Sequence, residues 1–211
     1  WQYIKDGPNT ITESELQRVK AFFSEPAYET NIISNLEAYQ NDKAFSQWLT
    51  RCTHKHKKQG YRAVTLSLKP IHTAPGDATS EQMRAVASMA DEYSFGEIRV
   101  SHEQNLILAD VREDNLHELW KKAKDLNLAT PNVGLLTDII CCPGGDFCSL
   151  ANAKSIPIAE SIQAVFDDMD YLHDIGDINL NISGCMNACG HHHVGHIGIL
   201  GVDKNDSEWY Q

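Results

Sequence analysis

Apolar side chains recur at helical spacing through the first part of the chain. Residues 12–15 carry a capping-box pattern, in which Thr12 and Glu15 can each satisfy one free backbone N–H. Apolar residues at 16, 19, 22 and 23 then predict a helix that ends at Pro26. A second helical pattern spans residues 34–50. The polar, basic segment 54–60 is predicted to be a linker.

The pattern changes to alternating strands and helices over residues 61–128. Alternation predicts a half-buried strand at residues 64–68, and a second capping box at Thr79 opens a helix. Two short strands are expected near residues 98–100 and 106–111, followed by a helix over residues 116–126. The order β-α-β-β-α is that of a ferredoxin-like unit without its last strand.

The last part of the chain mixes helices, strands and turn residues. A short helix is predicted over residues 147–156 and a longer one over 157–173, with Pro157 in its first turn. Residues 178–182 alternate as a strand, and residues 197–202 and 207–211 form a predicted hairpin. The expected fold class is α+β. We divide the chain into a helical lead-in with linker (1–60), a ferredoxin-like half-domain (61–130) and an α/β domain (131–211).

Composition narrows the classes of protein and partner. The 211 residues are 42% hydrophobic and 22% charged, which suits a globular chain with a core. A formal net charge of −11 makes nucleic acid an unsuitable partner. No apolar run is long enough to span a membrane and no secretory signal is visible, so we expect a cytoplasmic protein without a membrane partner. The first residue, Trp1, indicates a trimmed start.

Four of the six cysteines form two pairs that can act together. Cys142 and Cys148 are spaced C-x5-C, and after 36 residues Cys185 and Cys189 are spaced C-x3-C. Each pair is expected to follow a strand and a turn and to precede a helix, whose N-terminal N–H groups would stabilise thiolates. Four thiolates fit a 4Fe–4S cluster. A zinc site, structural cysteines and redox cysteines remain alternatives, and three disulfides would require a secreted protein.

Two motifs carry a resemblance to a known family. The sequence GCMNACG at residues 184–190 completes the cysteine pattern, and RVSHEQNL at residues 99–106 lies far upstream in the expected half-domain. Together they resemble the sirohaem and 4Fe–4S sulfite and nitrite reductases, over roughly residues 55–211. The resemblance is strongest to the assimilatory sulfite reductase haemoprotein.

The resemblance implies a role for each matching residue. The cluster ligands would be Cys142, Cys148, Cys185 and Cys189, and Cys189 would also bridge to the sirohaem iron. The residues expected along the sirohaem are Arg99, Ser101, Gln104 and Asn105. A guanidinium and amide donors suit a macrocycle that carries carboxylates. Asn187 is expected to fix the turn between the last two ligands.

The implied reaction is the six-electron reduction of sulfite to sulfide, with nitrite reduction by the same family as the alternative. Family members contain two ferredoxin-like half-domains, and only the second is expected here. The resemblance therefore implies a C-terminal part of a reductase, with residues 131–211 as a sirohaem and 4Fe–4S domain truncated at its end, inactive alone and holding no catalytic residue. Its partners would be the N-terminal half of the reductase, a small inorganic anion, and an NADPH-flavoprotein or ferredoxin as electron donor. A non-catalytic zinc- or cluster-binding module is the competing class.

Other residues near the motifs have less specific interpretations. Cys141 is expected to be a buried thiol outside the ligand set, and Cys52 an ordinary cysteine at a helix end. His191, His192 and His193 directly follow the second cysteine pair. They could pack near the cofactors, lie in a solvated loop or bind a metal.

Overall fold

The computed structural model describes residue 7 and residues 10–211, which divide into two contact units, 1–30 and 31–211. Helix α2 (Glu13–Lys20) lies in the first unit, and its N-cap Thr12 accepts a hydrogen bond from the Glu15 backbone N–H at 3.2 Å. The Glu15 carboxylate pairs with Arg18. The helix ends at Lys20, before the predicted end at Pro26.

The second unit contains an antiparallel sheet with the predicted β-α-β-β-α order, preceded by one further strand. Its strands run in the order β1-β2-β4-β3. The elements are β1 (Thr53–Lys55), β2 (Tyr61–Leu66), α4 (Ser80–Tyr93), β3 (Arg99–Val100), β4 (Leu106–Arg112), the 3-10 turn η2 (Glu113–Asn115) and α5 (Leu116–Asp125). The α+β fold class and the ferredoxin-like half-domain are confirmed.

Strand β1 is the feature of this sheet that the sequence pattern missed. Part of it lies in the segment 54–60, which was predicted to be a linker, and it pairs with β2 in the register Thr53↔Val64. The segment turns back into β2 through Gly60, whose φ is +84°. Strand β1 occupies the edge beside β2, where the last strand of a complete ferredoxin-like unit pairs with its first. The sheet therefore has four strands.

The predicted helix over residues 34–50 is two shorter elements, η1 (Leu36–Tyr39) and α3 (Lys43–Cys52). The Asp42 carboxylate accepts a hydrogen bond from the Phe45 N–H at 3.0 Å, which starts α3 as a separate helix. Phe45 and Trp48 are fully buried in the core of this half, together with side chains of α4 and α5.

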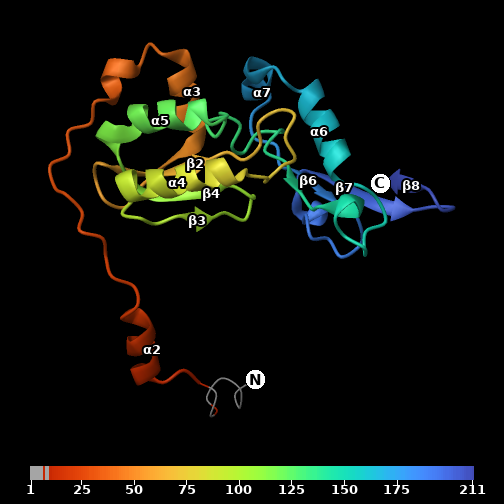
Figure 1. The fold of residues 1–211 in the computed structure, drawn as a ribbon, viewed down its shortest axis with the longest axis horizontal. Helices are drawn as coiled ribbons and strands as arrows, with labels where there is room; N and C mark the ends of the chain where they lie inside the picture. The colour runs from red at the N-terminus through yellow and green to blue at the C-terminus, as the bar shows by residue number, and fades with distance from the viewer. Residues whose placement is uncertain (1–6, 8–9) are drawn as a thin grey trace. The chain divides into compact units, whose positions relative to one another are not determined.

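A second sheet follows, with strand order β5-β6-β7-β8. Its first three strands are parallel, and β7 and β8 form the predicted antiparallel hairpin. The strands are β5 (Ile140–Cys141), β6 (Leu180–Ser183), β7 (Ile197–Asp203) and β8 (Glu208–Tyr210), with helices α6 (Ile156–Val165) and α7 (Met169–Ile175) and the 3-10 turns η3 (Gly144–Asp146) and η4 (His192–Val194). Helices α3, α4 and α5 lie beside the first sheet, and α6 and α7 lie near the second (Figure 1).

Two helix predictions in this part are wrong. Residues 147–155 form turns and bends, because their backbone groups bond to neighbouring loops: the Asn152 and Ala153 N–H groups both donate to Gly184 O. The predicted helix over residues 157–173 is interrupted after α6, and the Asp168 side chain caps the start of α7. Among the residues that the structure describes, no helix is long and apolar enough to span a bilayer.

The caps of α4 and α2 provide a matched test of this division into units. In α4 both bonds of the capping box form, between Thr79 and Gln82. We expect Thr79→Ala to lower the free energy of unfolding of the main transition by about 1 kcal/mol, because it removes a side-chain cap from a helix that packs into the core. Thr12→Ala removes the cap of α2, outside that unit, and should leave the main transition unchanged. Urea unfolding of both variants checks this, and equal losses would contradict it.

Candidate functional site

The two cysteine pairs leave neighbouring strands at the same edge of the second sheet. Strand β5 pairs in parallel with β6, and the Cys142 N–H continues the ladder by donating to Ile182 O at 3.1 Å. Cys142 directly follows β5, and Cys185 follows β6 after Gly184. Because the carboxyl ends of parallel strands meet at one edge, the loops that carry the two pairs start side by side.

Glycines allow these loops to pack at backbone distance. A Cβ atom on Gly184 would lie 2.9 Å from Gly144 Cα and 2.6 Å from Ala153 O, so a side chain does not fit there. Gly144 has φ +58°, which other residues adopt rarely. The Gly145 N–H donates to Ala153 O at 2.9 Å. The two loops therefore form one backbone frame.

The thiols differ in exposure. Cys142 and Cys185 are each 8% exposed, Cys148 is half-buried and Cys189 is exposed. The Gly184 N–H donates to Cys142 Sγ at 3.1 Å, and backbone donors to sulfur are typical of cluster sites. Four thiols, one of them with a backbone donor, are the donor types that a 4Fe–4S cluster uses. Over the described residues, no group of three or more Cys, His, Asp or Glu side chains is gathered as a closed metal site.

The cysteines lie in turns rather than at the starts of helices, which corrects that prediction. After Cys148 the chain remains non-helical until α6. Between Cys185 and Cys189, the left-handed residue Ala188 (φ +56°) prevents a continuous helical turn. The Ala188 N–H donates to Cys185 O at 3.2 Å and closes a tight turn instead. Donors near the sulfurs therefore come from turn backbone, not from a helix dipole.

The upstream motif forms a tight turn between β3 and β4. The Ser101 N–H donates to Asn105 O at 2.9 Å, and Ser101 Oγ accepts from the Asn105 N–H at 3.2 Å. Gln104 takes a left-handed conformation with φ +58°. These bonds fix the direction in which the side chains of Gln104 and Asn105 leave the turn.

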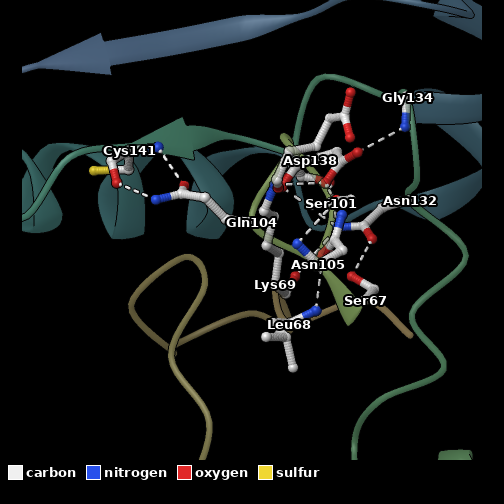
Figure 2. A network of polar contacts seen from close by, with 12 residues as sticks. Ser67, Leu68, Lys69, Ser101, Gln104, Asn105, Asn132, Gly134, Asp138 and Cys141 are labelled. Atoms are coloured by element: carbon white, nitrogen blue, oxygen red, sulfur yellow. Dashed lines mark hydrogen bonds and ion pairs between the residues drawn. The ribbon is translucent and has the colours of Figure 1, made fainter. Parts of the chain in front are cut away.

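Gln104 joins this turn to the strand that leads into the first cysteine pair. Its Nε2 donates to Cys141 O at 2.9 Å and its Oε1 accepts from the Cys141 N–H at 2.8 Å (Figure 2). Asn105 is 1% exposed and also bonds in two directions. Its Oδ1 accepts from the Leu68 N–H and its Nδ2 donates to Asp138 Oδ1, both at 3.0 Å.

A buried ion pair lies at the centre of this network, and the sequence pattern did not reveal it. Lys69 Nζ and Asp138 Oδ1 are 2.7 Å apart, with side-chain exposures of 0% and 4%. The Gly134 N–H donates to the other Asp138 oxygen at 2.9 Å, and Lys69 also donates to Glu103 O (Figure 2 shows the network). Burial lowers the pKa of the Lys69 ammonium, and the Asp138 charge opposes that shift.

The network continues through Asn132, which follows the ferredoxin-like half along the chain. Its Oδ1 accepts from Ser67 Oγ at 2.8 Å, and its Nδ2 donates to Lys69 O at 3.2 Å. Buried polar side chains from three stretches of sequence thus provide one another's hydrogen-bond partners. Periodicity could not identify these residues, because most of them lie in connections outside the helices and strands, where a polar residue normally indicates a loop.

A cavity of about 310 Å³ lies beside this network. Thr65 and Ile107 line it from the face of the first sheet opposite to Leu66 and Leu108, which belong to the core. The other lining residues are His54, Ser101, His102, Glu103, Asn105, Val133, Gly134, Asp138, Ile140, Asn179, Asn181, Val194 and Gly195. Its size suits a small molecule or part of a larger one.

The residues predicted to lie along the sirohaem, and Asn187, do not all lie at the same cavity. Ser101 and Asn105 line the cavity, whereas Gln104 lines a smaller one of about 130 Å³ beside Cys141. Arg99 lies on exposed β3 and donates to the Glu97 carboxylate. Asn187 is exposed in the turn between the last two cysteines.

The other cysteines and the histidines have simpler surroundings. Cys141 is 3% exposed, and burial raises the pKa of its thiol to about 12. Cys52, at the end of α3, is fully buried, and burial also raises the pKa of its thiol. His191 lies against His102, which lines the cavity, with ring centroids 4.9 Å apart.

Comparisons with known proteins agree on one family. A profile described as "Nitrite/Sulfite reductase ferredoxin-like half domain" matches residues 54–126. The ferredoxin–nitrite reductase of Spinacia oleracea is 27% identical over 179 residues, covering 82% of this chain and 28% of its own length. A ferredoxin sulfite reductase of Mycolicibacterium paratuberculosis is 26% identical over 155 residues, covering 71% of this chain and 28% of its own.

A solved structure supports the fold. The NirA protein of Mycobacterium tuberculosis superposes with a TM-score of 0.56 at 20% identity, covering 89% of this chain and 32% of that one. This chain therefore spans about a third or less of the length of the proteins that it resembles.

The ion pair at the centre of the network can be tested directly. Lys69→Met leaves the Asp138 carboxylate buried without its charge partner, and we expect a loss of about 3–5 kcal/mol in the free energy of unfolding. Lys69→Met combined with Asp138→Asn removes both charges and should recover part of that loss. Lys43→Met, which removes an exposed pair with Asp170, is the control and should unfold like the wild type. Denaturant unfolding measures all three, and a small loss for Lys69→Met would contradict a buried pair.

Proposed function

We propose that the chain belongs to the nitrite and sulfite reductase family and supplies the part of such an enzyme that holds the 4Fe–4S cluster and one side of the sirohaem. The proposal rests on the proximity of the cysteine loops to the polar turn 101–105. The loops of both cysteine pairs start at one sheet edge, and the turn 101–105 bonds through Gln104 to the strand before Cys142.

The four paired cysteines are the proposed cluster ligands. Cys142 is held by the Gly184 N–H, and the packed loops fix its position relative to the second pair. Cys189 is the exposed member, which suits a thiolate shared between the cluster and the sirohaem iron. The proposed ligands are Cys142, Cys148, Cys185 and Cys189. When bound, the coupled centres would supply electrons to a substrate on the iron.

The sirohaem is proposed to lie along the turn between β3 and β4. Ser101 and Asn105 line the cavity there, and the Asn105 side chain is already fixed by Leu68 and Asp138. Arg99 lies on the adjoining exposed strand, where its guanidinium could exchange Glu97 for a carboxylate of the macrocycle. Asn187 is proposed to support the turn that presents Cys189.

The proposed reaction of the whole enzyme is the six-electron reduction of sulfite to sulfide. Nitrite reduction is the second candidate, and it is supported by relatives named ferredoxin–nitrite reductases, which match at similar identity. The same names, and that of the sulfite reductase relative, support ferredoxin over an NADPH-flavoprotein as electron donor. Because the chain spans about 28% of the curated relatives, we propose that the isolated 211 residues do not turn over substrate.

A non-catalytic zinc- or cluster-binding module is the competing proposal. Such a module needs the cysteine loops but has no use for a polar turn beside a cavity. The rigid turn 101–105 and the neighbouring cavity therefore favour a reductase.

Turnover by the full-length protein tests the proposed function. With reduced ferredoxin, we expect sulfide from sulfite or ammonia from nitrite, and Cys189→Ser should reduce the rate by about 100-fold or more, because it removes a shared ligand. Cys52→Ala is the control, since Cys52 is a buried cysteine outside the proposed ligand set, and should keep the cofactor spectrum. Failure of the wild type to reduce either anion, with sirohaem bound, would overturn the proposal.

A further inference from the structure

We infer that Gln104 is a positioning residue for the first cluster ligand, Cys142, which it reaches through the backbone of Cys141. The inference rests on the proposed function, because it takes Cys142 to be a ligand. It assigns Gln104 an action on the cluster, whereas the resemblance in sequence implied a place beside the sirohaem.

The geometry begins with the edge of the second sheet. Strand β5 is the first strand of that sheet and pairs with β6 on one side. The Cys142 N–H donates toward β6, to Ile182 O. In a parallel ladder neighbouring residues point their backbone groups to opposite sides, so the N–H and C=O of Cys141 face away from β6.

The Gln104 amide takes the place of a missing strand beside Cys141. Cys141 is 3% exposed, so its outward N–H and C=O need partners within the protein. The Gln104 side chain supplies both, as donor at 2.9 Å and acceptor at 2.8 Å, in the pattern of one backbone pair. Gln104 thus holds Cys141 on the side away from β6, while the Cys142 N–H is bonded to β6 on the other side.

The surrounding turn and the loop at Gly76 fix the position of Gln104. Ser101 and Asn105 close the turn that sets its left-handed backbone, and Asn105 is anchored by Asp138. A Cβ atom on Gly76 would lie 3.1 Å from Gln104 Cβ, so the loop at Gly76 packs closely against the side chain. A displacement of the turn would therefore move Cys141, and with it Cys142.

Side-chain chemistry explains why glutamine suits this position. Asparagine has an amide but is one methylene shorter and cannot span to Cys141. Glutamate can accept a hydrogen bond from the Cys141 N–H. Its second carboxylate oxygen cannot donate to the Cys141 carbonyl oxygen and repels it. Methionine has a similar length and makes neither bond. These differences give variants that separate volume from hydrogen bonding.

The experiment compares Gln104→Met and Gln104→Glu with Gln82→Met in the full-length protein. Gln82 is a matched control, because its amide also makes two backbone bonds, to the Thr79 N–H and Leu126 O, away from the cysteines. We measure the rate of iron release to a chelator and the electron paramagnetic resonance spectrum of the reduced cluster. Outer interactions of this kind change metal affinity by about 10–100-fold. We expect release at least tenfold faster and a changed spectrum in both Gln104 variants, with Gln82→Met within twofold of wild type.

If Gln104→Met and Gln104→Glu match Gln82→Met in both measurements, the positioning role is wrong. If either Gln104 variant fails to fold, Gln104→Asn replaces it, because asparagine tolerates the left-handed backbone. This variant must then show the same faster release of iron. Cys142→Ala separates this failure from failure of the proposed function. If Cys142→Ala keeps the cluster spectrum and iron content, the proposed ligand set is wrong. If it loses them while the Gln104 variants do not, only the positioning role is overturned.

Discussion

Parallel pairing of β5 with β6 is the constraint on which the candidate site depends. Strand β5 has only two residues, so its own ladder with β6 gives it little stability. Gln104 supplies the bonds on its other side, and the packed glycines at 144 and 184 hold the loops that follow. Without this strand position, the two cysteine pairs would leave the sheet at unrelated places.

The buried polar network explains how the ferredoxin-like half controls that strand. Lys69 lies shortly after β2 along the chain, Asp138 lies two residues before β5, and Asn105 contacts both the Leu68 backbone and Asp138. A buried ion pair adds little net stability compared with apolar packing, but breaking it is costly. We interpret the pair as a device that fixes one arrangement of the two sheets, since an alternative arrangement would leave a charge buried and unpaired.

The sequence pattern predicted correctly those elements whose stabilising contacts lie between residues close together in the sequence. The box at Thr79 and the β7–β8 hairpin formed as expected, because their determinants lie within a few residues. The helix over residues 147–156 was wrong because bonds to Gly184, distant in sequence, replaced its helical bonds. Strand β5 and the Lys69–Asp138 pair have no periodic signature and could be found only in three dimensions. The cysteine pairs were visible as a motif, whereas the action of Gln104 on Cys141 was not.

We propose that the paired cysteine loops hold an iron–sulfur cluster. Its most direct measurement is iron, acid-labile sulfide and zinc analysis of anaerobically purified full-length protein. We expect about four iron and four sulfide per chain for the cluster, one further iron for the sirohaem, and no stoichiometric zinc. One zinc per chain without sulfide would contradict this expectation and would identify the loops as a structural metal site.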